Sequence, residues 1–134
     1  METIGEFNRH RYLNLATFRL DGSEVQTPVW FAAAGERLYV FTARESGKVK
    51  RLRRSARARI APCDVRGRIL GAWQEASVRI VTEHRTIGLA QGALRAKYGW
   101  QMWLTDLGSR LAGRIQNRSW LEIVPGRQSG PPAA

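Results

Sequence analysis

Short runs of apolar and β-branched residues, separated by turn-forming residues, recur along this chain of 134 residues. Asp21-Gly22 is a strong two-residue hairpin pattern, and Gly35-Glu36 and Arg66-Gly67 mark further turns. This spacing predicts a mainly β fold in which antiparallel strands close into a small barrel of the OB-like or split-barrel type. The six expected strands span residues 11–20, 24–33, 37–43, 57–64, 68–82 and 114–124.

Two segments between the expected strands are predicted to be helical. Residues 84–98 place apolar side chains at helical spacing, and Gly99 is a natural stop for this helix. Residues 47–55 form a shorter basic helix. The apolar stripe that docks the basic helix consists of Val49, Leu52 and Ala56. The other expected elements are a short helix or lead-in at 4–10, a loop with a short helix at 100–112 and a disordered tail at 126–134, which leaves residues 1–125 as one domain.

The residue inventory excludes several classes of function. Cys63 is the single cysteine, so an internal disulfide and a multi-cysteine zinc site are ruled out, and we expect it to be a packing residue. His10 and His84 have no ligand-like spacing, so we expect no metal site. No Ser/His/Asp pattern and no paired carboxylates appear, so an enzyme of this sequence depends on a cofactor for its chemistry. The absence of a signal peptide and of a membrane-spanning apolar run favours a cytoplasmic protein.

Charge is the unusual property of the sequence. The formal net charge is +11, and residues 44–59 carry eight basic residues with Glu45 as the only acid. Such a run is compatible with a solvated helix face, but it repels itself and favours contact with an anion. Because a helix begins near Gly47, its free backbone N–H groups form a phosphate-binding candidate together with nearby hydroxyls and cations. The residues of this candidate are Thr42, Ser46, Gly47, Lys48, Lys50 and Arg51.

Several segments in fixed order carry a family resemblance, namely YLNLATFRLDGSEVQTPVWF, SGKVKRLRR, RIAPCDVRGRILGAW and AKYGWQ. They resemble the PPOX-class flavin and deazaflavin oxidoreductases, which are related to pyridoxamine 5′-phosphate oxidase, and in particular the small actinobacterial type that uses coenzyme F420. The resemblance covers residues 4–125. It implies a six-stranded antiparallel split barrel of the FMN-binding type, which forms a homodimer with cofactor sites at the interface.

The resemblance also implies where a cofactor lies. Its phosphate belongs where a strand meets the basic helix, which matches the phosphate-binding candidate. Its ring lies along the second strand, at Gln26, Thr27, Pro28, Val29 and Trp30, with Ala61, Pro62 and Cys63 as neighbours. Lys97, Tyr98 and Trp100 are expected to come from the partner subunit.

The implied function is hydride transfer between reduced deazaflavin and a small organic acceptor, with no catalytic side chain assigned. The basic segment favours F420, whose tail carries several carboxylates, over FMN, which ends at one phosphate. An FMN- or haem-binding barrel is the alternative within the fold. A non-catalytic barrel that binds single-stranded nucleic acid is an alternative of another class, but residues 44–59 contain none of the aromatic residues that such a surface needs. Five tryptophans further favour a homodimer.

Overall fold

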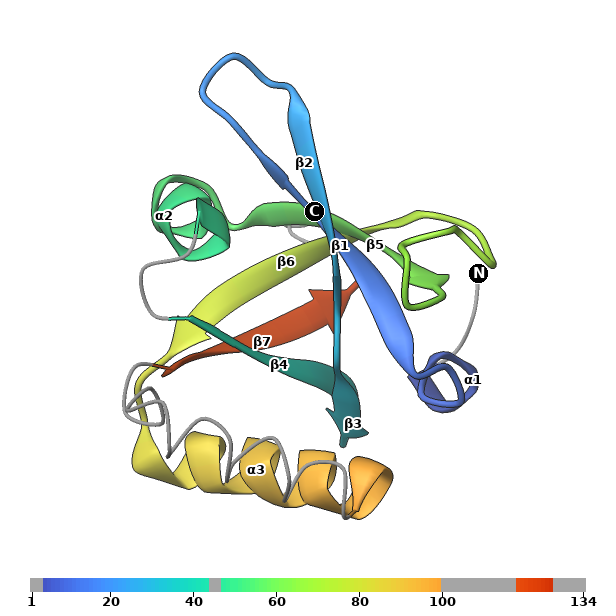
Figure 1. Cartoon of the computed structure of the whole chain (residues 1–134). Helices are drawn as coiled ribbons and strands as arrows, with labels where there is room; N and C mark the ends of the chain where they lie inside the picture. The colour runs from blue at the N-terminus through green and yellow to red at the C-terminus, as the bar shows by residue number, and fades with distance from the viewer. Residues whose placement is uncertain (1–3, 44–46, 100–117, 127–134) are drawn as a thin grey trace.

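The computed structural model describes residues 4–43, 47–99 and 118–126. Its strands form one antiparallel sheet in the order β2-β1-β5-β6-β7-β4-β3 (Figure 1). The bounds are β1 Tyr12–Phe18, β2 Glu24–Val29, β3 Ala32–Ala34, β4 Arg37–Ala43, β5 Arg57–Cys63, β6 Gln74–Val81 and β7 Arg118–Pro125. The two edge strands, β2 and β3, are consecutive in the chain, so the backbone between them closes the sheet into a barrel. The predicted mainly β, antiparallel barrel is confirmed.

The strand expected over residues 24–33 is two strands, which gives seven strands where six were predicted. The chain leaves β1 after Val29 and pairs with β4 from Ala32 onwards. Between these strands the backbone of Phe31 bonds to a side chain: its N–H donates to the Tyr98 hydroxyl at 3.0 Å, and its carbonyl accepts from the same hydroxyl at 2.8 Å. The side chain of Tyr98 therefore replaces a strand partner at the point where the barrel closes.

Three helices accompany the described part of the sheet: α1 Ile4–Phe7, α2 Gly47–Arg54 and α3 His84–Tyr98. Gly99 ends α3 with a positive φ of 57°, as the sequence predicts. Within α2, Val49 and Leu52 are buried. Ala56 is exposed, so its expected place in the docking stripe is wrong: the helix stops at Arg54, and Ala56 lies beyond it.

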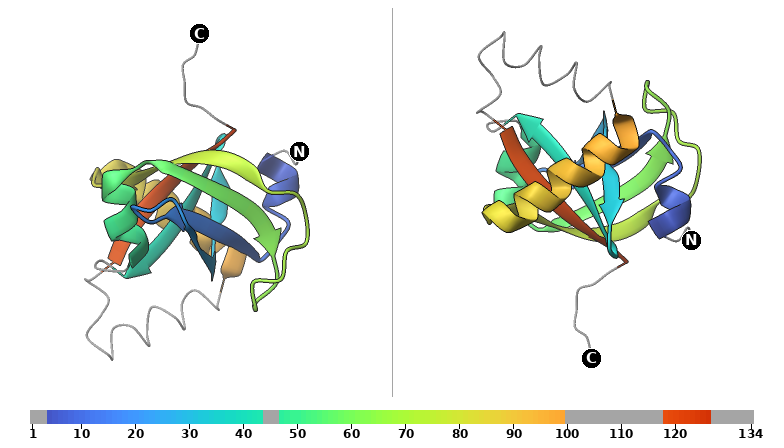
Figure 2. Two further views of the ribbon diagram at one scale, coloured as in Figure 1. Left: turned by 90° about the horizontal axis from the view of Figure 1, so that it is seen from above. Right: turned by 90° about the horizontal axis from the view of Figure 1, so that it is seen from below.

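The apolar side chains form two layers. The interior of the barrel contains residues from nearly every strand, and Leu13, Phe31 and Leu121 are fully buried there. The second cluster lies between α3 and the outer side of the sheet, and it contains Leu94, Tyr98 and Trp120. Figure 2 shows α3 lying across that face in the view from below. Helix α2 packs on β1 and β6, at the other end of the barrel.

The expected strand over residues 68–82 begins only at Gln74. Before it, the Asp64 carboxylate accepts hydrogen bonds from the backbone N–H groups of Arg66 and Arg68, both at 2.9 Å, and this holds the chain in a tight turn. Gly71 therefore precedes the strand. The expected elements at 100–112, the start of the last strand and nearly all of the tail lie outside the described residues. Among the helices described, none has the length and apolar character needed to cross a membrane.

Candidate functional site

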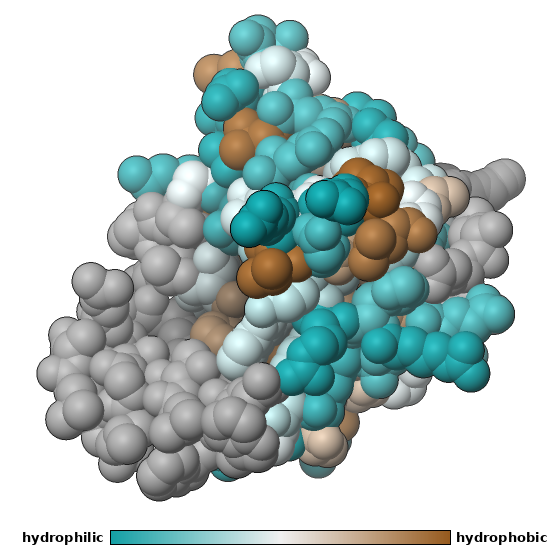
Figure 3. Space-filling view, turned by 45° about the vertical axis from the view of Figure 1, so that its right-hand side comes forward, coloured by the Kyte–Doolittle hydropathy of each residue, from teal (hydrophilic) through white to brown (hydrophobic). Residues whose placement is uncertain are grey.

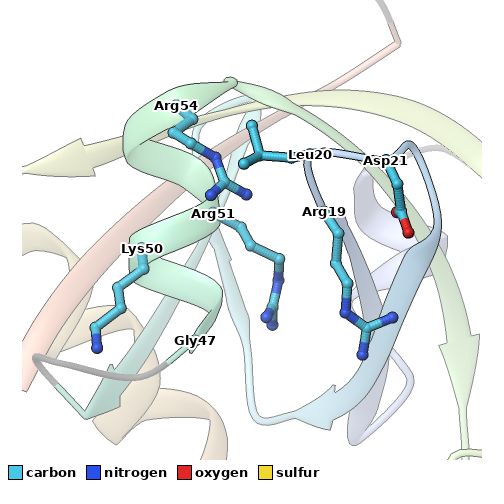
Figure 4. Close-up of a pocket in the computed structure, with 7 residues that line it drawn as sticks. All are labelled: Arg19, Leu20, Asp21, Gly47, Lys50, Arg51 and Arg54. Carbon is cyan, nitrogen blue, oxygen red and sulfur yellow. The ribbon is translucent and has the colours of Figure 1, made fainter.

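A cavity of about 470 Å³ opens between the β1–β2 hairpin and α2. We call it the basic pocket. Arg19, Leu20 and Asp21 come from the hairpin, and the remaining lining residues come from α2 (Figure 4). The side chains of the pocket provide four cations and one carboxylate. Its lining residues are Arg19, Leu20, Asp21, Gly47, Lys50, Arg51 and Arg54.

Arg51 is the most constrained cation of the basic pocket. Its Nε donates to the Thr17 hydroxyl on β1 at 2.6 Å, which fixes the guanidinium between helix and strand. A Cβ atom on Gly47 would lie 2.8 Å from Arg51 Nη1, so a larger residue there would displace the end of the Arg51 side chain. Burial, followed by the nearby charges of Arg19 and Arg54, lowers the pKa of Arg51. The cations of the pocket therefore repel one another, and an anion bound among them would relieve that repulsion.

The one carboxylate of the basic pocket is occupied locally. Asp21 accepts from the backbone N–H of Ser23 at 2.9 Å and from the Ser23 hydroxyl at 2.7 Å. These two hydrogen bonds lower the pKa of Asp21, which keeps it ionised. Arg19 donates to the same Ser23 hydroxyl at 3.2 Å. The hairpin thus holds Arg19 and Asp21 in a fixed turn at the mouth of the pocket, and the pocket as a whole stays cationic.

The structure brings together half of the phosphate-binding candidate. Gly47, Lys50 and Arg51 line the basic pocket. Lys48 does not line it: this lysine is half-buried, and its pKa is lowered by burial and by the charge of Arg51. Thr42 lies in β4 opposite Ser119, and Ser46 lies outside the described residues. Arg19, which the sequence analysis missed, lies at the pocket because the hairpin reaches over α2.

The residues expected around a cofactor ring are neighbours across β1. Asn14 of β1 lies opposite Pro28 on β2 and opposite Ala61 on β5, so the three form one row on the outer side of the sheet. Gln26, Thr27, Val29 and Trp30 continue along this edge and are exposed or half-buried. On β5 the expected neighbours are buried beneath the following loop, and these are Ala61, Pro62 and Cys63.

Asn14 is a further residue of this row that the sequence analysis missed. Its amide nitrogen donates to the Gly67 carbonyl at 3.2 Å, and its Oδ1 is buried with no hydrogen-bond partner among the described residues. Burial, with a smaller effect of the Asp64 charge, raises the pKa of the nearby Cys63 thiol to about 11. A protonated, buried thiol agrees with the predicted packing role of Cys63.

The end of α3 meets the end of β2 in the same chain. The rings of Trp30 and Tyr98 stack with centroids 4.6 Å apart and planes 10° apart. The Tyr98 hydroxyl bonds to the backbone of Phe31, as above, and lies 2.7 Å from the Arg11 carbonyl, so the Phe31 and Arg11 carbonyls share its single proton. Within its own chain Tyr98 makes these contacts, and its expected contribution to the partner subunit's cofactor site stays a prediction. Lys97 lies beside it, and Trp100 lies outside the described residues.

A family model described as pyridoxamine 5′-phosphate oxidase matches residues 1–128. The chain belongs to this family. The resemblance to the pyridoxamine 5′-phosphate oxidase family is thereby confirmed, and with it the split-barrel fold, while the F420-using type stays a prediction. No curated protein matches the chain.

Solved structures of the same fold belong to proteins whose names refer to different cofactors. The haem storage protein HutZ of Vibrio cholerae is 14% identical, with a TM-score of 0.68 over 93% of this chain and 89% of its own. A protein named F420 reductase is 17% identical, with a TM-score of 0.56 over 95% of both chains. An FMN-binding protein of Nostoc punctiforme, related to pyridoxamine 5′-phosphate oxidase, is 16% identical, with a TM-score of 0.55 over 86% of this chain and 70% of its own. At these identities the likeness concerns the fold.

Proposed function

We propose that this chain binds coenzyme F420 with its anionic part in the basic pocket, and that it is an F420-dependent oxidoreductase. The observation that carries the proposal is the pocket's charge: four cations surround one carboxylate that is already held by Ser23. F420 has a phosphodiester followed by several carboxylates, whereas FMN ends at a single phosphate. A pocket with this excess of cations suits the longer polyanion.

The residues present fit such a ligand in two further ways. The missing side chain of Gly47 lets Arg51 lie against the helix start, where backbone N–H groups also face an anion. At the other end of the proposed site, the unpaired acceptor of Asn14 lies in the row with Pro28 and Ala61. Deazaflavin rings carry N–H groups, which could donate a hydrogen bond to Asn14 Oδ1. Lys50 and Arg51 would hold the phosphodiester, and Arg19 and Arg54 the carboxylates beyond it.

The role of the barrel is to fix the ring along β2, from Gln26 to Trp30, and to exclude water from it. When bound, reduced deazaflavin supplies a hydride to a small organic acceptor. We further propose that the protein works as a cytoplasmic homodimer. Large apolar side chains on the surface support a dimer: Val65 and Leu70 in the loop after β5 are 62% and 54% exposed. Figure 3 shows apolar side chains breaking the hydrophilic surface on one face.

The decisive experiment is a fluorescence titration with two forms of the cofactor, one with its full tail and one truncated before the glutamates. A charge-assisted contact to phosphate contributes about 1.5–3 kcal/mol, so Lys50→Ala should weaken both forms about ten- to a hundredfold. Arg19→Ala should weaken the full-length form more than the truncated form. Arg85→Ala, an exposed cation on α3, is the matched control and should leave both affinities unchanged.

Lys48→Ala and Lys50→Ala together test which lysine contacts the anion. The sequence places Lys48 first after the expected anion site, but Lys50 is the lysine that lines the basic pocket. We therefore expect Lys50→Ala to have the larger effect. Wild-type affinity in Lys50→Ala, or an equal effect of Arg19→Ala on the two cofactor forms, would contradict the proposal. A purified protein with a flavin or haem absorption spectrum would favour FMN or haem instead.

A further inference from the structure

Lys97, in the last turn of α3, carries an amine that does not line the basic pocket. Lys97 Nζ is buried and has no hydrogen-bond partner among the described residues. It lies 3.5 Å from the centre of the Phe31 ring and 5.4 Å from the centre of the Tyr98 ring. Contact with an aromatic face offsets part of the cost of burying an ammonium group, but it leaves the three N–H donors without acceptors. A buried donor of this kind is stabilised by a ligand that brings an acceptor.

The surroundings of Lys97 make it a titratable group at neutral pH. Burial is the main cause, and the charge of Arg11, from the segment before β1, is the second; together they lower the pKa of Lys97 to about 7. The titratable neighbour on its own helix is Tyr98. Within the described residues Lys97 forms no ion pair with a carboxylate. Both the ammonium and the neutral amine are therefore populated near pH 7, which is the condition under which a proton donor is easily recharged.

Tyr98 also lies at the Trp30 end of β2, but it is not suited to release a proton. Its hydroxyl is held by Phe31 and by the Arg11 carbonyl. Burial raises the pKa of Tyr98 to about 12. Donating this proton to a ligand would break bonds that close the barrel. The ammonium group of Lys97, one residue earlier, forms no such hydrogen bond with the residues that the structure describes.

We propose that Lys97 is the proton donor to an acceptor molecule that binds beside the Trp30–Tyr98 pair. This inference rests on the proposed function. Transfer of a hydride to the acceptor's carbon forms a C–H bond and places the displaced electron pair on an oxygen of the acceptor. The Lys97 ammonium then gives its proton to that oxygen, becomes a neutral amine and regains a proton from water. The acceptor gains two hydrogens and is reduced, the deazaflavin is oxidised, and the proton that the deazaflavin releases returns to solvent.

The acceptor class follows from this chemistry. It is an electron-poor conjugated molecule with a carbonyl oxygen that becomes negatively charged during reduction. Such an oxygen supplies the hydrogen-bond acceptor that Lys97 Nζ lacks, so the four-carbon stem has reason to turn the amine away from the Phe31 ring.

The first test follows the amine itself and needs no turnover. The chain contains three lysines, so selective 13C labelling at lysine Cε gives three signals, and Lys97→Met identifies one of them. We expect the Lys97 signal to titrate with a midpoint near pH 7 and to shift when a conjugated carbonyl compound is added to the cofactor-bound protein. A midpoint near the usual lysine value of about 10.4 would overturn the proposal.

The second test compares the pH dependence of turnover in wild type, Lys97→Met and the control Arg85→Met, with a conjugated enone and reduced F420. Wild-type kcat should fall as pH rises through 7, because the protonated amine is lost. Lys97→Met should lower kcat about a hundredfold, remove this dependence and leave F420 affinity unchanged. Turnover with the wild-type pH profile in Lys97→Met would overturn the role of Lys97 alone. Wild type that binds no F420 would instead overturn the proposed function, and this inference with it.

Discussion

Tyr98→Phe tests how the barrel is closed. The substitution keeps the ring that stacks on Trp30 and removes only the hydroxyl. The buried N–H of Phe31 then loses its acceptor, and the Phe31 and Arg11 carbonyls lose a donor. A buried donor left unsatisfied costs about 1–3 kcal/mol. We therefore expect the free energy of unfolding to fall by about 2–3 kcal/mol, and the melting temperature to fall by roughly 8 °C in a domain of this size.

The measurement is urea unfolding followed by tryptophan fluorescence, with Tyr39→Phe as the matched control. Tyr39 also loses a buried hydroxyl, which donates to Glu122 Oε2 at 2.9 Å. Glu122 keeps its ion pairs with Arg37 and Arg79 through Oε1, so its charge stays paired and the loss is confined to one acceptor, Oε2. The control should cost less than Tyr98→Phe, which removes the partner of three backbone groups. If Tyr98→Phe is no more destabilising than Tyr39→Phe, the hydroxyl does not hold the closure and the reasoning is refuted.

Three further predictions concern other parts of the molecule. Lys97→Met should raise the free energy of unfolding by about 2–4 kcal/mol below pH 7, because there Lys97 of the wild type is charged in both states and only the folded state buries the charge. This gain should decline as pH rises from 7 to 10.5 and then vanish, and urea unfolding at several pH values would show it. Cys63→Ala should keep at least half of the activity, because the thiol is buried and protonated, and a hundredfold loss would contradict its packing role. Light scattering should give about twice the chain mass of 15.1 kDa, and a monomer at micromolar concentration would contradict the proposed dimer.

Local sequence patterns predicted the elements whose ends depend on local interactions. The strand at 37–43 and the helix at 84–98 have the expected bounds, because the turn at Gly35 and the stop at Gly99 act within a few residues. The division of the strand at 24–33 was not predictable in this way. Its cause is a hydroxyl that lies 67 residues away in the chain. The tight turn that follows β5 depends on the Asp64 side chain, which accepts hydrogen bonds from two following backbone N–H groups.

The residues of the candidate site were likewise predictable from local sequence patterns only in part. Lys50 and Arg51 follow from the strand, glycine and basic-helix pattern, and both line the basic pocket. Arg19 carries no local pattern that marks it as a binding residue. It reaches the pocket because the β1–β2 hairpin lies beside α2, and this contact is decided by packing of the whole barrel. Lys48 shows the opposite error: its place in the sequence favours an anion contact, but it does not line the pocket.

Strand β2 relates the two regions for which we propose functions. The basic pocket lies at the hairpin before Glu24, and the Trp30–Tyr98 pair with Lys97 lies just after Val29. Figure 1 shows this path as one continuous ribbon from the tip of the hairpin to β3. Six extended residues span roughly 20 Å. A ligand with an anionic tail at one end and a planar ring at the other can therefore lie along β2, with the cations of the pocket at its tail and the Trp30–Tyr98 pair beside its ring. The same Tyr98 hydroxyl that closes the barrel fixes the ring end of this path, so the closure of the sheet and the position of the proposed proton donor depend on one contact.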